Sequence, residues 1–255
     1  MIKIVVCGIC GRMGKEIISL VNQLDDIDIV GGVEAEGSGY IGKTIDGIKV
    51  FNDILECIGE ADCIVEFTNP KATIDNLTRA ERSKKGYVIG TTGFNEDEIQ
   101  MIQSYSREIP IFLAPNMSRG VNHLYRLVEL TTRSLERYDI EIIETHHRNK
   151  KDAPSGTARA IAQIIGSIKP DTDFVYGREG IIGVRKENEV GICSVRGGDV
   201  VGEHRVLFLG PGEFIELRHY ATSRKAFASG AMDAVRFIVN KGPGFYTMKD
   251  LMERV

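Results

Sequence analysis

The N-terminal segment, residues 1–34, constrains the fold more than any other part of the chain. Residues 2–7 form a short, nearly all-apolar run, which is typical of a parallel strand buried on both faces. A glycine-rich segment from Gly8 to Gly14 follows at once, and residues 15–24 have the apolar spacing of a helix. A glycine loop in this position lets the backbone approach a pyrophosphate at the helix start, so the order predicts a dinucleotide-binding fold. A tight turn without a ligand is the plainer alternative.

The loop departs from the usual G-x-G-x-x-G spacing, because Cys10 occupies the place of the middle glycine. Glu34 follows a second predicted strand, residues 27–33. An acidic residue there binds the ribose hydroxyls of the adenosine and repels a 2′-phosphate, so we expect NADH to be favoured. Arg12 offers a contact to a 2′-phosphate, which keeps NADPH as an alternative. The cofactor-binding residues predicted in the loop are Gly8, Ile9, Cys10, Gly11, Arg12 and Met13.

Strand–turn–helix units repeat over the first half of the chain. They predict an α/β, Rossmann-like fold, with a doubly wound, right-handed, parallel sheet. Ligands of such sheets bind at the carboxyl ends of the strands. The predicted strands are residues 63–68, 87–90 and 111–114, and the predicted helices are residues 53–59, 71–85 and 97–107.

The second half predicts an α+β domain with a mixed or antiparallel sheet. Its last three strand candidates alternate between apolar and polar residues and are separated by glycine turns, which is typical of antiparallel strands. A helix, residues 121–135, precedes this region. The antiparallel strand candidates are residues 190–195, 201–209 and 213–219.

Titratable side chains are concentrated between the two halves. A β-branched strand at residues 140–143 leads into a polar segment that holds His146, His147 and Lys150. Ser155 is then a plausible N-cap of a helix at residues 158–165, and a helix start attracts a carboxylate or phosphate. Two imidazoles, an ammonium and an anion-binding helix start together indicate a proton-donating site for an acidic small molecule.

Two other interpretations of these residues are weaker. His146 and His147, with Glu144 or Asp152, are possible zinc ligands, but the i, i+4 histidine pair of a helical zinc site is absent, so we expect no metal. Adjacent histidines on a strand point to opposite faces and should not share one role. Cys7 and Cys10 formally make C-x-x-C, but one thiol ends a strand instead of opening a helix, which disfavours redox chemistry.

Composition excludes several classes of function. The chain has 255 residues, 42% of them hydrophobic and 27% charged, which is ordinary for a globular protein. A net charge of −4 gives no basic footprint for nucleic acid. The first apolar run is too short for a signal peptide or a membrane span, and an odd number of cysteines, five, favours reduced thiols. We therefore expect a cytoplasmic protein without nucleic-acid or membrane partners.

Residues 141–158, E-I-I-E-T-H-H-R-N-K-K-D-A-P-S-G-T-A, closely resemble a known signature. It is that of the dihydrodipicolinate reductase family, E-x-x-E-x-H-H-x-x-K-x-D-x-P-S-G-T-A, and every fixed position is present. The resemblance implies NAD(P)H-dependent reduction of 4-hydroxy-tetrahydrodipicolinate to tetrahydrodipicolinate, in diaminopimelate and lysine biosynthesis. It also implies that His146 and Lys150 are the catalytic proton donors, and that His147, Gly156 and Thr157 bind the substrate.

The resemblance extends over essentially the whole chain. G-T-T-G-F and A-P-N-M-S resemble the segments with which the family holds the nicotinamide half of the cofactor. Ala35 stands where many relatives carry an arginine for the NADPH phosphate, which again favours NADH. Further matches run through residues 177–180 and 196–204, where we expect Arg196, Glu203 and His204 to have sheet-surface or interface roles. The cofactor contacts implied by the resemblance are Gly90, Thr91, Thr92, Ala114, Pro115, Asn116 and Met117.

The family precedent also implies the domain organisation. Helices predicted at residues 226–239 and 248–253 would return to the nucleotide domain, which would comprise residues 1–117 and 224–255. Residues 118–223 would form a substrate-binding and oligomerisation domain, with a homotetramer built through its sheet.

Two other functions fit the residues less well than the reductase. Another Rossmann dehydrogenase of the aspartate pathway would need a nucleophilic cysteine, and the second domain offers only Cys193, in a predicted strand. A non-catalytic NADH-sensing regulator would have no need of the complete H-H-x-x-K group.

Overall fold

The computed structural model describes residues 1–253, and the chain divides into two compact units. Unit 1 comprises Met1–Arg119 and Arg224–Val255, and unit 2 comprises Gly120–Ser223. Each unit has its own sheet and its own apolar core. Within the described residues, no helix is both long and apolar enough to cross a membrane.

Unit 1 is built on an eight-stranded sheet in the order β13-β7-β6-β5-β1-β2-β4-β3. All neighbours are parallel except β3 and β4, which form an antiparallel hairpin. The strand order reverses between β1 and β5, as in a Rossmann-like fold, so the predicted fold class is confirmed. Its elements are β1 (Ile2–Cys7), α1 (Arg12–Val21), β2 (Ile27–Val33), β3 (Thr44–Ile45), β4 (Ile48–Phe51), η1 (Ile54–Glu56), η2 (Ile58–Glu60), β5 (Cys63–Glu66), α2 (Pro70–Ala80), η3 (Glu81–Ser83), β6 (Gly86–Ile89), α3 (Glu96–Tyr105), β7 (Pro110–Leu113), α6 (Lys225–Ile238), β13 (Gly244–Tyr246) and α7 (Met248–Met252).

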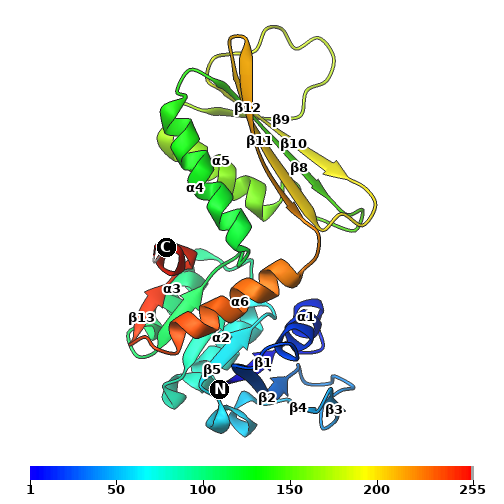
Figure 1. Ribbon diagram of the computed structural model, residues 1–255, viewed down its shortest axis with the longest axis vertical. Helices are drawn as coiled ribbons and strands as arrows, with labels where there is room; N and C mark the ends of the chain where they lie inside the picture. Colours follow the sequence, from blue (N-terminus) through cyan, green and yellow to red (C-terminus); the bar gives the residue numbers. More distant parts are fainter. Residues whose placement is uncertain (254–255) are drawn as a thin grey trace. The chain divides into compact units, whose positions relative to one another are not determined.

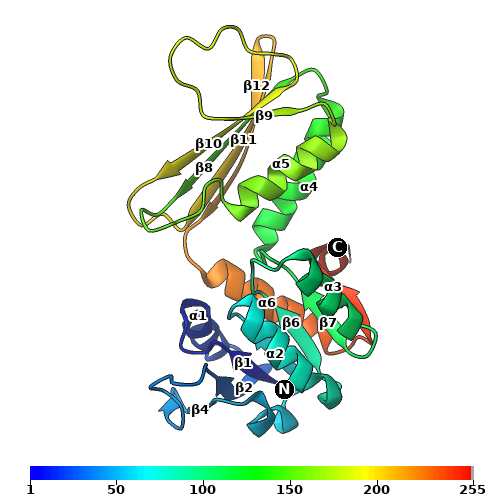
Figure 2. The same cartoon turned by 180° about the vertical axis from the view of Figure 1, so that it is seen from behind.

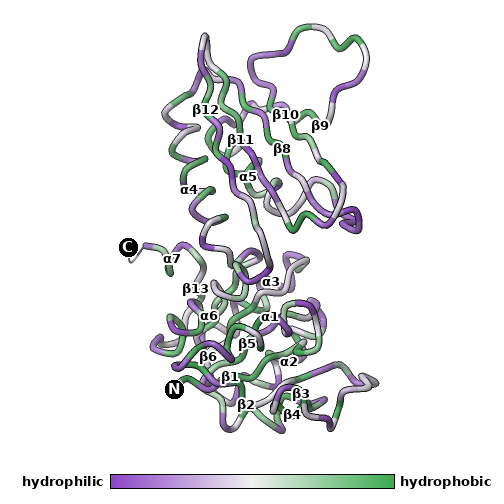
Figure 3. Tube along the Cα trace, turned by 45° about the vertical axis from the view of Figure 1, so that its right-hand side comes forward, coloured by the Kyte–Doolittle hydropathy of each residue, from purple (hydrophilic) through white to green (hydrophobic). Residues whose placement is uncertain are grey.

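Apolar residues on alternate sides of β1 explain why helices cover both faces. Ile4 and Val6 pack into a core with α1 and α6, whereas Val5 and Cys7 pack into a second core with α2 and α3. Figure 1 shows α1 and α6 on one face of the unit 1 sheet, and Figure 2 shows α2 and α3 on the other. The central strands β1 and β5 are hydrophobic along most of their length (Figure 3).

Several local features of unit 1 differ from the sequence predictions, among them α1, which begins at Arg12 and not at residue 15. The helix expected at residues 53–59 is instead two 3₁₀ turns, η1 and η2, since a short segment that contains Gly59 cannot sustain an α-helix. Strand β13 was not predicted, because three residues carry no periodic signal. The C-terminal helix α6 returns to this unit, where a Cβ at Gly230 would lie 1.7 Å from the carbonyl oxygen of Met117. That close approach requires glycine.

Unit 2 is a five-stranded sheet in the order β12-β11-β8-β10-β9, with α4 and α5 on one face (Figure 1). Leu124 and Val128 of α4 and Ile161 and Ile165 of α5 pack on the apolar side chains of that face, such as Ile142. Its elements are α4 (Arg119–Ser134), β8 (Asp139–His146), α5 (Gly156–Ile168), β9 (Asp173–Tyr176), β10 (Glu189–Arg196), β11 (Gly202–Gly210) and β12 (Glu213–Ala221).

The pairing of this sheet corrects one prediction. Strands β11 and β12 form the expected antiparallel pair, but β10 is parallel to both β8 and β9. The connection from β8 passes through α5 before it returns to the sheet, and such a crossover aligns strands in parallel. Strand β9, with four residues, was not predicted. The parallel register places Arg196 directly beside His146.

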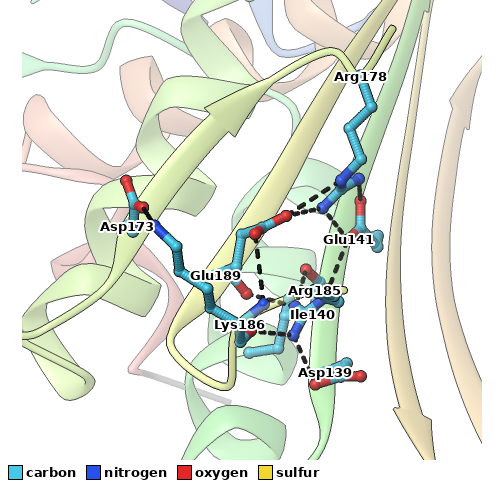
Figure 4. A network of polar contacts seen from close by, with 8 residues as sticks. All are labelled: Asp139, Ile140, Glu141, Asp173, Arg178, Arg185, Lys186 and Glu189. Atoms are coloured by element: carbon cyan, nitrogen blue, oxygen red, sulfur yellow. Dashed lines mark hydrogen bonds and ion pairs between the residues drawn. The ribbon is translucent and has the colours of Figure 1, made fainter. Parts of the chain in front are cut away.

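A polar network fastens the loop of residues 177–188 to the uncovered face of the unit 2 sheet (Figure 4). Arg178 donates to both carboxylate oxygens of Glu141, at 2.9 and 2.8 Å, and also to Glu189. Arg185 pairs with Asp139 at 2.6 Å. A Cβ at Gly191 would lie 1.9 Å from a carboxylate oxygen of Glu141, so this glycine makes room for the network.

Candidate active site

The glycine loop of unit 1 has the backbone geometry of an anion site. Gly8 has φ of +78°, and a Cβ there would lie 2.7 Å from the carbonyl oxygen of Phe67. A Cβ at Gly14 would lie 2.2 Å from the carbonyl oxygen of Ile9, so glycine lets α1 pack closely on the loop. Gly11 is the N-cap of α1 and provides no side-chain cap. The first-turn N–H groups of α1 can therefore serve a pyrophosphate.

A carboxylate lies beside this loop. Glu34 follows β2, and its Oε1 accepts a hydrogen bond from the backbone N–H of Cys10 at 2.6 Å. Burial and the charge of Glu34 raise the pKa of the Cys10 thiol to about 11, so the thiol stays protonated. Burial likewise raises the pKa of Cys7. Because neither thiol is activated and all five cysteines are free, redox chemistry of the C-x-x-C pair is disfavoured.

The other predicted cofactor segments lie at the same sheet edge, after β6 and β7. The ring of Phe67 covers Gly90, where a Cβ would lie 2.0 Å from the ring. Thr92 and Pro115 are exposed, whereas other predicted residues have buried side chains that can meet a ligand only through their main chain. Those with buried side chains are Ile9, Thr91, Ala114 and Met117.

In unit 2, His146 ends β8 beside a fully buried carboxylate. The His146 Nδ1 lies 2.5 Å from Oε2 of Glu144. Arg196 of β10 donates to both oxygens of Glu144, at 2.8 and 2.7 Å, and the N–H of Ser155 donates at 3.1 Å. Burial acts to raise the pKa of Glu144, but the hydrogen bonds from His146 and Arg196 outweigh it and hold that pKa well below its usual range.

The ionised Glu144 determines how His146 is oriented. A carboxylate can only accept, so the proton on this side of the ring is assigned to Nδ1 and Nε2 is the nitrogen left to exchange a proton. Gly202 of β11 lies beside that nitrogen, where a Cβ would be 3.0 Å from Nε2. The imidazole is thus held in one orientation with its reactive nitrogen next to a residue without a side chain.

A second histidine packs against the first and stays neutral. The ring of His204 lies edge-on to that of His146, with centroids 5.2 Å apart. Burial, with the nearby His146, lowers the pKa of His204 to about 3. The hydroxyl of Ser155 lies 2.9 Å from the His204 Nε2, to which it can donate. His204 is therefore a neutral structural support for the site and does not compete for its proton.

The polar segment after β8 carries the predicted lysine. Lys150 Nζ lies 2.8 Å from Asp152, and its side chain is 19% exposed. The Nδ1 of His147 is buried without a protein partner, and its backbone N–H donates to the carbonyl of Val200. His146 and His147 therefore have separate surroundings, and Lys150 presents an ammonium with a carboxylate counter-ion.

The start of α5 completes the site. Ser155 caps the helix by accepting from the N–H of Ala158 at 3.2 Å. A Cβ at Gly156 would meet nothing within 4 Å, so packing does not require glycine there and the space beside the helix start is open. The side chain of Thr157 is hydrogen-bonded to Tyr125. A helix N-terminus with open space beside it suits a carboxylate.

Two supports of this site were not predicted from the sequence. Arg196 and His204 were expected on the sheet surface or at an interface, which is wrong: Arg196 binds Glu144, and His204 is buried against Ser155. The alternation of β11 puts His204 on the same side as the buried Val206, which was a usable signal. Glu203, in contrast, pairs with Arg218 at 2.7 Å across the outer strands, as a sheet-surface residue would.

The fold and these residues define an oxidoreductase with a Rossmann-like nucleotide unit and a second unit that bears acid groups. Two family models match the chain: "Dihydrodipicolinate reductase, N-terminus" over residues 2–117 and "Dihydrodipicolinate reductase, C-terminus" over residues 120–252. The chain belongs to the dihydrodipicolinate reductase family. It is accordingly an oxidoreductase that uses a nicotinamide cofactor.

Comparisons over the full length agree with this membership. The chain is 44% identical to a 4-hydroxy-tetrahydrodipicolinate reductase of Aquifex aeolicus (98% of each chain) and 41% identical to one of Caldanaerobacter subterraneus (100% of this chain, 99% of the relative). Among solved structures, a dipicolinate-bound dihydrodipicolinate reductase from Paenisporosarcina sp. TG-14 has a TM-score of 0.80 and 25% identity, and covers 97% of both chains.

Proposed function

We propose that this protein reduces 4-hydroxy-tetrahydrodipicolinate, through its dehydrated form, to tetrahydrodipicolinate in diaminopimelate and lysine biosynthesis. The observation that carries the proposal is the buried Glu144, which orients His146 beside the Lys150 segment in a chain of this family. The relatives named above carry the same activity in their names. An aspartate-pathway dehydrogenase with a thiol nucleophile fits less well, because Cys193 pairs with Ile143 on the face of the sheet opposite His146.

Unit 1 fits a nicotinamide dinucleotide, which supplies the hydride when bound. The glycine loop and the start of α1 would hold the pyrophosphate, and Glu34 would accept from the adenosine ribose. Glu34 and the neighbouring Ala35 favour NADH, whereas Arg12 is exposed beside the loop and gives NADPH a contact. The segments at residues 90–92 and 114–117 would hold the nicotinamide half.

Unit 2 would supply the proton and bind the dicarboxylate substrate. Hydride addition to a conjugated C=C–C=N system leaves negative charge at its far end, which must be protonated. His146 donates from Nε2, and Glu144 stabilises the imidazolium before the proton leaves. The Lys150 ammonium is the alternative source of this single proton. The start of α5 at Gly156 and Thr157, with His147, binds a substrate carboxylate.

We further propose that the chain forms a homotetramer through the outer face of the unit 2 sheet, in the cytoplasm. Exposed apolar residues on that face support the assembly: Phe214 is 62% exposed and Tyr220 50% exposed, and Val195 and Leu209 are also exposed. Light scattering should give about four times the mass of one chain. The five free thiols suit a reducing compartment.

An absorbance assay at the nicotinamide band tests the proposed reaction. Freshly generated substrate is mixed with the protein and either NADH or NADPH. We expect consumption of the reduced cofactor that depends on substrate and is faster with NADH. Failure of both cofactors to be consumed, with folded protein, would contradict the proposal.

A further inference from the structure

A buried carboxyl group in unit 1 is neither a proton donor nor a ligand contact in the proposed reaction. Glu66 is the last residue of β5 and is fully buried. It lies in register with Cys7 of β1 and Ile89 of β6, so it occupies the carboxyl edge at the point where the strand order reverses. Ligands of doubly wound sheets bind just outside this point.

Four donors converge on Glu66. Its Oε1 accepts from the hydroxyl of Thr68 at 2.5 Å, and its Oε2 accepts from the amide of Asn76 at 3.0 Å and the hydroxyl of Tyr87 at 2.8 Å. The thiol of Cys7 is the fourth donor. No lysine, arginine or histidine is among these partners, and burial raises the pKa of Glu66.

The cluster continues into the two segments that leave β5 and β6. Thr91 Oγ1 accepts from the backbone N–H of Thr68 at 3.1 Å and from the hydroxyl of Thr73 at 2.9 Å. Thr68 is therefore tied both to Glu66 and to the turn after β6. Phe67, between Glu66 and Thr68, packs its carbonyl against Gly8 and its ring against Gly90.

We infer that Glu66 is a positioning residue for the dinucleotide: its hydrogen bonds hold the segments after β5 and β6 in the shape that receives the cofactor. This inference rests on the proposed function. Glu66 itself is fully buried and acts through Thr68, Thr91 and Phe67.

A purely structural role would not explain this cluster. The preceding residues of β5, Ile64 and Val65, fill the same two cores with apolar side chains, and a buried carboxyl costs folding free energy that an apolar residue does not. The polar group occurs at the end of the strand, where the chain must turn toward a ligand. Of its partners, Thr68 and Cys7 lie at that edge and Asn76 lies on α2, whereas Tyr87 lies within β6 opposite Ile64.

Equilibrium binding of NADH to four variants of the full chain tests the role. Glu66→Leu removes all the acceptors. Thr73→Val leaves Glu66 unchanged and removes a hydroxyl that donates to Thr91 at 2.9 Å and lies 3.4 Å from the Thr68 hydroxyl. Glu66→Gln keeps an acceptor for Asn76 and Tyr87 and can donate to Thr68. Ser106→Ala is the control, because Ser106 is a buried hydroxyl of unit 1 that bonds only to Gln103.

The NADH dissociation constant should rise about tenfold in Glu66→Leu and about threefold in Thr73→Val, as expected for lost buried hydrogen bonds. It should stay within about threefold of wild type in Glu66→Gln and be unchanged in Ser106→Ala. This should hold even if these two variants lower the melting temperature as much as Glu66→Leu does. The KM for NADH should rise in parallel while kcat at saturating NADH is kept.

Two results would overturn the proposals, and they can be told apart. If wild type binds neither NADH nor NADPH, the proposed function is overturned, and this inference falls with it. If wild type binds NADH and the folded Glu66→Leu or Thr73→Val variants bind it equally well, only the positioning role is overturned. Thr73→Val is nearly isosteric and decides the matter should Glu66→Leu fail to fold.

Discussion

The Glu144 carboxylate lies 2.5 Å from Nδ1 of His146 in the interior of unit 2, and it is the strongest constraint on that imidazole. The same carboxylate is held by both guanidinium N–H₂ groups of Arg196. The carboxylate, the imidazole and the guanidinium thus form one buried unit.

Glu144→Gln should lower kcat by about 10²-fold, because the amide neither stabilises an imidazolium nor specifies the proton at Nδ1. The NADH dissociation constant should not change, since Glu144 belongs to unit 2. Steady-state kinetics and NADH titration check both parts. A kcat near that of wild type would show that the pair has no role in proton donation.

Arg196→Ala should lower the free energy of unfolding by roughly 3 kcal/mol, because it leaves Glu144 buried without its cation. Arg196→Lys should recover only part of the loss, since lysine cannot make the two-pronged contact. Arg133→Ala is the matched control: Arg133 pairs with Glu129 on the surface of α4, and its loss should change stability by less than about 0.5 kcal/mol. Urea denaturation at pH 7 measures all three, and equal effects of the two alanine variants would refute the buried pair.

The burial of a neutral His204 should make the stability of the protein depend on pH. Its pKa is lowered from 6.5 to about 3 in the folded state. On acidification, His204 is therefore protonated in the unfolded chain at a pH where it is still neutral in the folded chain. The contribution of His204 to the free energy of unfolding is therefore fully present above pH 6.5 and is lost as the pH falls towards 3. Between pH 6 and 5 the loss should approach about 1.4 kcal/mol per pH unit.

Chemical denaturation of His204→Gln tests that slope. The variant should show a flatter dependence of the unfolding free energy on pH between pH 6.5 and 5.5, above the ordinary carboxyl pKa of 4.5 near which Glu144 begins to contribute. His123→Gln, a change at an exposed histidine of α4, should leave the wild-type slope unchanged. If His204→Gln retains the wild-type slope, the buried neutral histidine is not its source.

Much of unit 1 was predictable because its signals are local. Apolar runs of four to seven residues, each followed by a turn and a helix, define a doubly wound sheet. The glycine turn after β1 was predicted, and Gly8 there has a positive φ, but α1 begins at Arg12 and not at residue 15, so Gly14 lies inside the helix. The short strands β9 and β13 escaped prediction because their neighbours in the sheet stabilise them, not their own sequence.

The supports of the acid site depend on contacts between distant residues. His146 and Lys150 were identified by a signature, but Arg196 is 52 positions from Glu144 and reaches it only because β10 is parallel to β8. Residues 190–195 were expected to form an antiparallel strand and Arg196 to have a sheet-surface or interface role, so neither expectation pointed to this contact. Arg178 reaches Glu141 across 37 positions for a similar reason.

Glu34→Ala should raise the NADH dissociation constant roughly tenfold and the NADPH constant by less, because a carboxylate assists ribose hydroxyls and repels a 2′-phosphate. It also frees the N–H of Cys10. Glu36→Ala, an exposed acidic residue of the following loop, is the control for net charge. Equal weakening of both cofactors by Glu34→Ala would rule out the ribose contact.

The central claim is that His146, oriented by Glu144, delivers the proton that completes the reduction. The most direct measurement is the kcat of His146→Gln with saturating NADH and substrate, alongside NADH titration of the same protein. We predict a kcat at least about 10²-fold below wild type with an unchanged NADH dissociation constant. A folded His146→Gln variant that turns over at the wild-type rate would contradict the account.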